Sequence, residues 1–545
     1  MRSPIVYFLF LIVIAILSCN PTQQDNKAAG SPFNRDSLAQ HIKMLASDSF
    51  QGRKPFSLGE TRTLDYLQNQ FRSLGLEPGN GNSYLQEVPM VNITVDPDSI
   101  MKVKTTKGSF DLKRFQDFVI TTENTDSVIS LDQDELVFAG YGVVAPEYNW
   151  NDYAGMDVKG KVVLVMVNDP GFGTTDTAIF KGKTMTYYGR WTYKYEEAAR
   201  QGAKACLIIH NTKAASYPFR VVQNSWGTSN LYLDKREKDP CVLKGWVSAD
   251  ATKKLLSAVG KDTALLLQAN NHGFRAISLG EKLSIRVRVK AVHNVSQNVI
   301  AKITGTKRPD EYILYTAHWD HLGIGTPDAK GDSIYNGAVD NASGTAALLE
   351  MARAFKNLQE KPERTVLFLS VTGEEQGLLG SEYYGQHPIY PLKKTVADLN
   401  MDGVSPDEKT NDFVIVGFGQ NELENYVADA AKIQGRYIAP ESRPEAGSYF
   451  RSDHFSLAKV GVPALSASGG IDIVGKGKDY GKKLEDDYIA HRYHAPSDEY
   501  NPAWTFEGGL QDMELLFMIG RRLAFETSWP AWKPGSEFKA IREKQ

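Results

Sequence analysis

Side chains that bind metals follow several apolar runs in this sequence. Three such runs are followed by His318, by the adjacent pair Glu374 and Glu375, and by Asp402. Imidazole and carboxylate groups are the ligands that zinc prefers outside cysteine sites, and one carboxylate can bridge two ions. The chemistry that these residues predict is hydrolysis assisted by a pair of divalent cations.

A charge balance supports this interpretation. Two divalent ions carry four positive charges, and Asp340, Glu374, Glu375 and Asp402 would carry four negative ones. Taken singly, a histidine after a strand is more often packed than a ligand, and two adjacent glutamates are more often a solvated turn. The prediction of a metal site rests on the occurrence of all these residues together in this order. The chain has no HExxH motif, which excludes the helix-borne zinc site of the common metalloproteases.

The elements that would position these residues alternate along the chain. From residue 298 onward, apolar strand-like runs alternate with segments of helical spacing, such as residues 344–358. This alternation predicts an α/β fold with a mainly parallel mixed sheet flanked by helices. In such sheets ligands bind beyond the carboxyl ends of the strands, where the histidine and the carboxylates would meet.

Composition bounds the organisation of the chain. At 545 residues it exceeds what one hydrophobic core usually serves. Short β-rich runs between turn residues predict a separate inserted domain. A net charge of -3 gives no basic field, so we expect no nucleic-acid partner. The predicted divisions are 33–132 for the first part of the catalytic domain, 133–285 for the insertion, 286–530 for the main part and 531–545 for a C-terminal tail.

The N-terminal residues 1–19 are typical of a secretory signal. A basic start and a short apolar run lead to Cys19, and ILSC resembles a bacterial lipobox, in which that cysteine is lipidated. Residues 20–32 then predict a flexible tether, and the protein would be an exported lipoprotein anchored in the membrane of the cell envelope. An uncleaved signal anchor is the alternative. The remaining cysteines, Cys206 and Cys241, allow one disulfide or two separate buried thiols.

Six motifs in their order resemble the secreted di-zinc exopeptidases, a family that includes bacterial and fungal aminopeptidases and glutamate carboxypeptidase. They are AHWDHLG at 317–323, GAVDNASGTA at 337–346, GEEQGLLGS at 373–381, NMDG at 400–403, RSDHFSLAKVGVPAL at 451–465 and YHAPSDEY at 493–500. The insertion resembles the protease-associated domain that many members carry.

The resemblance implies a zinc-exopeptidase fold, two Zn2+ ions per chain and a cis peptide bond after Asp340. It assigns His318 and Asp402 to one zinc, Glu375 and His494 to the other, and Asp340 to both. It also implies that Glu374 is the general base on a water that bridges the ions. Asp320 would be the acid that orients His318, and Tyr493 would donate a hydrogen bond to the scissile carbonyl.

Peptides are the substrates that this site implies, and an aminopeptidase is the function we expect first. A carboxypeptidase or dipeptidase of the same family would need a cation for the substrate carboxylate, and Arg451 is a candidate that a structural salt bridge would explain equally well. A catalytically silent binding protein is the third alternative. The complete set of ligands argues against it.

Overall fold

The computed structural model describes residues 31–545 except 175, 227, 228 and 236. Residues Phe33–Gln545 form one compact unit. The predicted signal peptide, Cys19 and most of the predicted tether lie outside the described residues. Across the described part of the chain, no helix combines the length and the apolar character that crossing a membrane requires.

A mixed sheet forms the centre of the part that carries the metal-ligand motifs. Along it the strands run in the order β13, β17, β14, β18, β21, β19 and β20, with β17, β14, β18 and β21 mutually parallel. The bounds are β13 Ile277–Ile303, β14 Arg308–His318, β17 Arg364–Val371, β18 Thr395–Asn400, β19 Asp412–Ile415, β20 Tyr437–Ala439 and β21 Ala464–Gly469. The predicted α/β class with a mainly parallel mixed sheet is confirmed.

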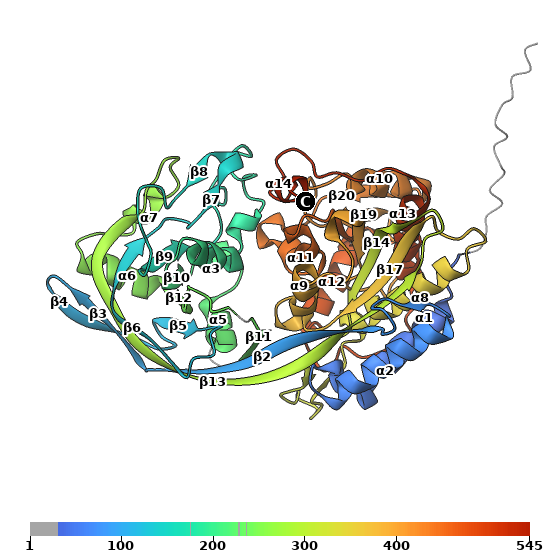
Figure 1. Cartoon of the computed structure of the whole chain (residues 1–545), viewed down its shortest axis with the longest axis horizontal. Coiled ribbons are helices and arrows are strands. Elements are labelled where there is room, and N and C mark those ends of the chain that lie inside the picture. The colour runs from blue at the N-terminus through green and yellow to red at the C-terminus, as the bar shows by residue number, and fades with distance from the viewer. Residues whose placement is uncertain (1–30, 175, 227–228, 236) are drawn as a thin grey trace, which may run out of the picture. The chain divides into compact units, whose positions relative to one another are not determined.

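Helices cover both faces of this sheet (Figure 1). The helices in this part of the chain are α1 Arg35–Leu45, α2 Leu58–Ser73, α8 Gly344–Lys356, α9 Leu379–Gln386, α10 Leu423–Ile433, α11 His454–Lys459, α12 Lys478–His491, α13 Glu507–Phe525 and α14 Lys539–Glu543. Side chains alternate along a strand, so Phe368 of β17 joins one core while its neighbour Leu367 joins another. Every residue of β17 is buried, as expected for a strand covered on both faces.

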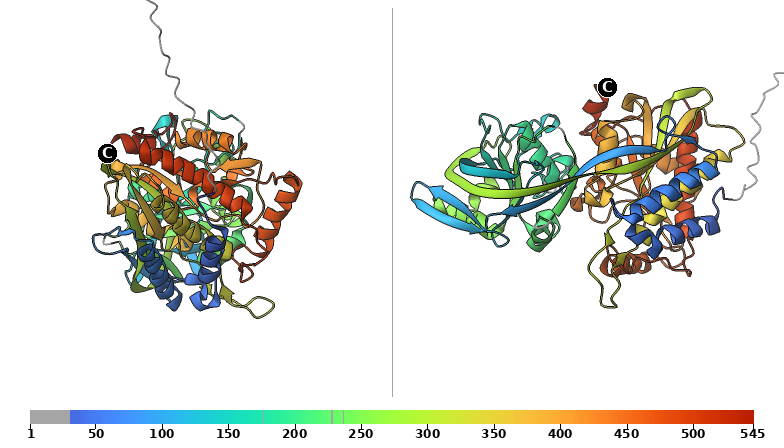
Figure 2. Two further views of the ribbon diagram at one scale, coloured as in Figure 1. Left: turned by 90° about the vertical axis from the view of Figure 1, so that its right-hand side faces the viewer. Right: turned by 60° about the horizontal axis from the view of Figure 1, so that its bottom comes forward.

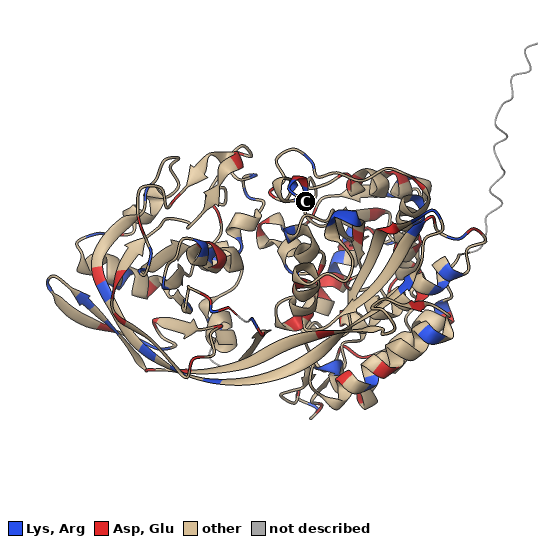
Figure 3. Ribbon diagram, in the orientation of Figure 1, with Lys and Arg blue, Asp and Glu red and all other residues tan. Residues whose placement is uncertain are grey.

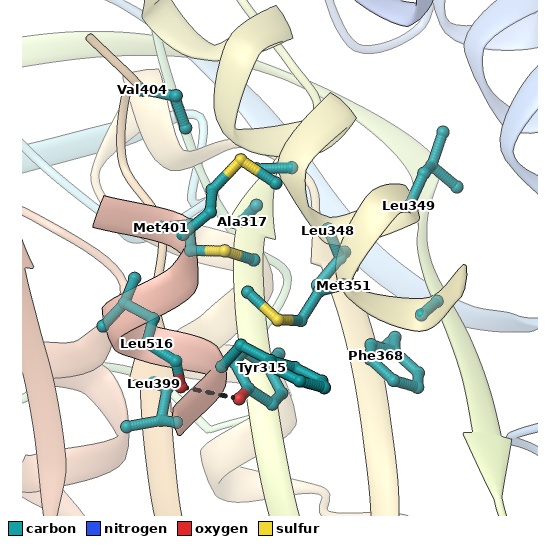
Figure 4. Packing of buried hydrophobic residues seen from close by; sticks show 14 of the residues in the cluster. Tyr315, Ala317, Leu348, Leu349, Met351, Phe368, Leu399, Met401, Val404 and Leu516 are labelled. Carbon is teal, nitrogen blue, oxygen red and sulfur yellow. Dashed lines mark hydrogen bonds between the residues drawn. The ribbon is translucent and has the colours of Figure 1, made fainter. Parts of the chain in front are cut away.

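The core beneath the metal-ligand loops is formed by β14, α8 and α13. Tyr315 of β14 packs among Met351 of α8 and Phe368 of β17 (Figure 4). Its hydroxyl donates to the carbonyl oxygen of Leu516 at 3.0 Å, which satisfies the one polar group of a fully buried side chain. This packing fixes β14 against α8, the helix that follows the loop of Asp340.

The segment between β2 and β13 has hydrophobic cores of its own. Its strands run in the order β13, β6, β9, β10, β12 and β5, with β6, β9, β10 and β12 mutually parallel. The bounds of the elements here are β1 Glu77–Pro78, β2 Leu85–Pro97, β3 Ile100–Thr105, β4 Gly108–Lys113, β5 Phe118–Thr121, β6 Val128–Phe138, β7 Val144–Ala145, β8 Trp150–Asn151, β9 Val162–Met166, α3 Trp191–Arg200, β10 Ala205–Ile209, α4 Thr212–Ala215, α5 Phe219–Trp226, β11 Ser229–Leu233, β12 Leu243–Val247, α6 Ala249–Ala258 and α7 Ala264–Gln268.

One long strand belongs to both parts. β13 pairs with β6 through its first half, with β2 from Val287 to Val299, and with β17 at its end; Figure 2 shows the curved course of β13 and β2 side by side. The predicted boundaries 132/133 and 285/286 fall inside β6 and β13. The division into a catalytic and an inserted domain therefore stays a prediction.

Three further features bear on the sequence analysis. Figure 3 shows Lys and Arg interspersed with Asp and Glu along the elements, without a basic stripe. Cys206 and Cys241 are both buried free thiols. Residues 470–489, a charged stretch with several glycines before His494, include most of the helix α12, and most residues of α12 are exposed.

Candidate metal centre

The carboxyl ends of three neighbouring parallel strands deliver the candidate ligands. His318 is the last residue of β14, Glu374 and Glu375 follow β17, and Asp402 follows β18 by two residues. Because β14 lies between β17 and β18 and all three are parallel, these ends meet at one edge of the sheet. The edge carries the cluster that the sequence motifs predict.

Asp340 lies at the centre of the cluster. Its Oδ1 is 3.4 Å from His318 Nε2, and its Oδ2 is 3.1 Å from His494 Nε2. The other oxygen near His318 Nε2 is Oδ1 of Asp402, at 3.2 Å. The peptide bond between Asp340 and Asn341 is cis. Asp340 thus faces one histidine with each carboxylate oxygen, as the resemblance implies for a shared ligand.

Glu375 meets two histidines. Its Oε2 lies 3.2 Å from His494 Nε2, and its Oε1 lies 2.5 Å from His321 Nδ1. His321 belongs to the AHWDHLG motif, in which only His318 and Asp320 were expected to act. Ligand atoms of His321, Asp340 and Glu375 lie within 4.8 Å of one another, as do those of His318, Asp340 and Asp402.

His321 and His494 occupy different places around Glu375. His494 Nε2 faces both Asp340 and Glu375, whereas His321 Nδ1 faces Glu375. Burial lowers the pKa of His321 to about 4, so its imidazole is neutral and its Nδ1–H can donate to Glu375. We therefore interpret His321 as the residue that orients Glu375, and His494 as the ligand.

The carboxylates of the cluster are electrostatically unfavourable without a cation. Burial, together with the neighbouring Asp340, raises the pKa of Glu375 to about 8. Burial also raises the pKa of Glu374 well above its usual value. In His318, burial lowers the imidazole pKa, but Glu374 and the nearby aspartates outweigh it and raise the pKa well above its usual value. Such mutual shifts are the signature of groups that share a site.

The donor set fits zinc. It offers imidazole nitrogens and carboxylate oxygens in two groups that share Asp340, and zinc takes these ligand types at short distances. The clustered negative charge gives a cation an electrostatic role, because in the described part of the chain these carboxylates pair with histidines and with no lysine or arginine. The residues that would hold the metal are His318, Asp340, Glu375, Asp402 and His494.

Glu374 lies beside the metal ligands but belongs to neither of the two groups that share Asp340. Its carboxylate Oε2 is 3.9 Å from His318 Nε2, and its backbone N–H donates to Asp320 Oδ1 at 3.1 Å. Asp320 lies 3.7 Å from His318 Nδ1, whose closer partner is the Asp320 backbone carbonyl at 3.1 Å. Asp320 therefore links the β14 and β17 ends, and it reaches His318 mainly through its backbone.

Tyr493 lies at the open side of the cluster. Its ring stacks on that of His494 with centroids 3.9 Å apart, and its side chain is half exposed. Burial of the remainder and the nearby carboxylates raise its pKa, so the phenol keeps its proton and can act as a donor.

Two buried residues that the sequence analysis did not single out hold the ligand loops. The guanidinium of Arg53 donates to the carbonyl oxygens of Leu45, Trp319, Asn336 and Gly337. The carboxylate of Asp498 accepts the backbone N–H groups of Val339 and Asp340. The only feature of the sequence that points to Asp498 is its place in the YHAPSDEY motif. Nothing in the sequence distinguishes Arg53 from a surface arginine.

Sheet and donor set together define an α/β protein with a histidine and carboxylate metal centre at the carboxyl edge of its sheet. Residues 298–517, which span this centre, match the family model described as Peptidase family M28. The matched segment carries all of the candidate metal ligands.

Curated relatives share parts of the chain. Aminopeptidase YwaD of Bacillus subtilis is 27% identical over 338 residues, which cover 60% of this chain and 58% of that protein. The glutamate carboxypeptidase 2 homolog of Caenorhabditis elegans is 33% identical over 199 residues, which cover 35% of this chain and 24% of that protein. The chain spans less than two thirds of the length of the curated relatives it matches.

A solved structure is similar along most of the chain. The aminopeptidase from Aneurinibacillus sp. strain AM-1 aligns with 91% of this chain and 96% of its own, at 20% identity and a TM-score of 0.48.

Proposed function

We propose that this protein is a zinc-dependent aminopeptidase that hydrolyses the N-terminal residue from peptides. The single observation that carries the proposal is Asp340, which faces His318 with one carboxylate oxygen and His494 with the other. The family match of residues 298–517 and the similarity to an aminopeptidase of Bacillus subtilis support it.

Two zinc ions, when bound, would supply the positive charge that acidifies the attacking water and polarises the scissile carbonyl. Glu374 accepts a proton from that water as its oxygen forms a bond to the carbonyl carbon. The Tyr493 hydroxyl donates a hydrogen bond to the carbonyl oxygen, on which negative charge develops. Glu374 returns the proton to the leaving amine when the C–N bond breaks.

The zinc content tests the shared role of Asp340. We expect two zinc ions per chain in active protein, and a loss of zinc together with activity in Asp340→Ala, measured by elemental analysis after gel filtration. Asp65→Asn is the matched control, because Asp65 is an exposed aspartate on α2. Full zinc content in Asp340→Ala would contradict the assignment.

A carboxypeptidase or dipeptidase is the second candidate function. Arg451 favours it, because its guanidinium donates to the Ala446 carbonyl oxygen and forms no ion pair with an acidic side chain of the described residues. A pair of peptides with free and with acetylated N-termini separates the two functions. An aminopeptidase requires the free amine, and cleavage of the acetylated peptide would favour the alternative.

The sequence also bears on the inserted segment and on where the protein resides. We propose that residues 133–285 act as an inserted protease-associated domain and that Cys19 carries a lipid anchor at the membrane of a bacterial cell envelope. The ILSC sequence supports the anchor. A Cys19→Ser variant should leave the membrane fraction, and its retention there would contradict the proposal.

A further inference from the structure

Residues 185–188, between β9 and α3, contact two parts of the molecule in alternation. Met185 packs in the hydrophobic core around α11, whereas Tyr188 packs in a core of the segment between β2 and β13. Thr186 donates from its N–H and from its hydroxyl to Oδ2 of the fully buried Asp169, at 3.0 and 2.7 Å. One side of this short segment is therefore fixed in its own part of the chain, and the other side is directed at α11.

Tyr187 connects the two parts through its ring and its hydroxyl. The ring centroid lies 5.3 Å from that of Phe455 and 6.2 Å from that of Phe450. The hydroxyl donates to Glu196 of α3, and Glu196 pairs with Lys459, the last residue of α11, at 2.8 Å. Because ring packing and the ion pair both depend on geometry, these contacts hold α11 and the residues before it in one position.

The first route from this contact to the metal centre passes through Ser452. Its Oγ accepts a hydrogen bond from Asn400 Nδ2 at 2.7 Å, and Asn400 Oδ1 accepts one from the Thr316 hydroxyl at 2.9 Å. Asn400 precedes Asp402 by two residues, and Thr316 precedes His318 by two. Ser452 therefore supports the ends of β18 and β14, from which two of the candidate ligands come.

The second route passes through Asp453, directly before α11. Its Oδ1 accepts a hydrogen bond from the Ser381 hydroxyl at 2.7 Å, and both side chains are fully buried. Ser381 belongs to α9, the helix that follows Glu374 and Glu375. A shift of α11 would thus move a group that supports the loop after β17.

We propose that Tyr187 is a positioning residue for the metal centre. It holds α11 where Ser452 and Asp453 support the loops of Asp402 and Glu375, and it acts through them rather than by contact with a ligand. Chains of packed and hydrogen-bonded side chains can carry such coupling between distant groups. The inference rests on the proposed function, because it concerns the same metal site.

Zinc affinity of the folded protein tests the proposal. We expect Tyr187→Ala to weaken zinc binding roughly 3- to 30-fold, as for other residues that support ligands without binding the metal. Competition with a chromogenic chelator, well below the unfolding temperature of the variant, measures it. Tyr187→Phe keeps the ring contacts and should recover most of the affinity. If Tyr187→Ala does not fold, Tyr187→Leu replaces it with a loss expected in the same direction.

Phe274→Ala is the matched control for a general loss of stability. Phe274 is a buried aromatic residue of the same part of the chain, and its ring packs against that of Phe138 with centroids 5.6 Å apart. The variant should have a lower free energy of unfolding and the zinc affinity of the wild type. A role of Tyr187 in stability alone would make the two variants alike.

A double variant tests the route through Ser452. If Tyr187 acts through this residue, the loss of zinc affinity in the double variant Tyr187→Ala, Ser452→Ala should be smaller than the product of the two single losses. Losses that multiply fully would show that the two side chains act independently and would overturn the route.

The outcomes separate this inference from the proposed function. Wild-type zinc affinity in Tyr187→Ala, or an equal loss in Phe274→Ala, would overturn the positioning role and leave the aminopeptidase function intact. A wild-type protein that binds zinc but releases no N-terminal residue from free-amine peptides would instead overturn the proposed function, and the comparison of zinc affinities would still stand.

Discussion

Asp498 holds the backbone of Asp340, because its Oδ2 accepts the Asp340 N–H at 3.1 Å. Both oxygens of Asp498 lie within hydrogen-bond distance of the Val339 N–H, and its own carbonyl accepts the N–H of Ala338. The loop that carries Asp340 is thus hydrogen-bonded to Asp498, which lies four residues after His494. Asp340 and His494 therefore keep their relative positions through one side chain.

Replacing Asp498 should weaken metal binding. Asp498→Asn removes the charge and one acceptor oxygen, so the Asp340 loop loses part of its support, and we expect about 10- to 100-fold lower zinc affinity. Competition with a chromogenic chelator measures it. Glu499→Gln is the matched control, since it removes a charge from the neighbouring exposed residue. Wild-type zinc affinity in Asp498→Asn would show that the loop holds its shape without this carboxylate.

Arg53 should matter for stability as well as for the site. Its fully buried guanidinium satisfies backbone carbonyls of four different residues, at 2.6–2.9 Å. Arg53→Met would leave these oxygens without donors, and we expect the free energy of unfolding to fall by roughly 3 kcal/mol or more, since each unsatisfied buried group costs about 1–3 kcal/mol. Urea unfolding measures the change, with the exposed Arg286→Met as control. An unchanged urea midpoint in Arg53→Met would show that these hydrogen bonds do not stabilise the fold.

Glu281 should make stability depend on pH. Its carboxylate is buried in β13 without a hydrogen-bond partner among the described residues, and burial raises its pKa to about 8 from 4.5. Between these values the unfolded chain binds fewer protons than the folded one, so stability falls as the pH rises through this window.

The neutral variant Glu281→Gln isolates that effect. We predict a smaller loss of unfolding free energy between about pH 5 and pH 8, and a gain of roughly 1–3 kcal/mol at pH 8 relative to wild type. Denaturant unfolding at both pH values checks it. The exposed Glu87→Gln serves as control. A slope identical to that of the wild type would mean that Glu281 is not the responsible group.

Residue order was enough to predict the α/β class and the gathering of the ligands. The strands at His318, Glu375 and Asp402 end where their apolar runs end, and parallel neighbours bring such ends together. His494 was harder, because it follows a helix rather than a strand. Only the resemblance placed it beside Asp340.

Other features depend on contacts that spacing does not encode. β13 runs through 27 residues because its two halves pair with different strands, so a predicted boundary fell inside it. Arg53 and Asp498 act through backbone groups of distant loops, and His321 acts through Glu375.

Glu374→Gln tests the central claim most directly. The substitution keeps the size of the side chain and removes the base, while His318, Asp340, Glu375, Asp402 and His494 remain. We expect zinc content equal to the wild type and a kcat on a free-amine peptide lower by about 100- to 10,000-fold. Wild-type turnover, or loss of zinc together with activity, would contradict the role of Glu374 as the residue that moves the proton.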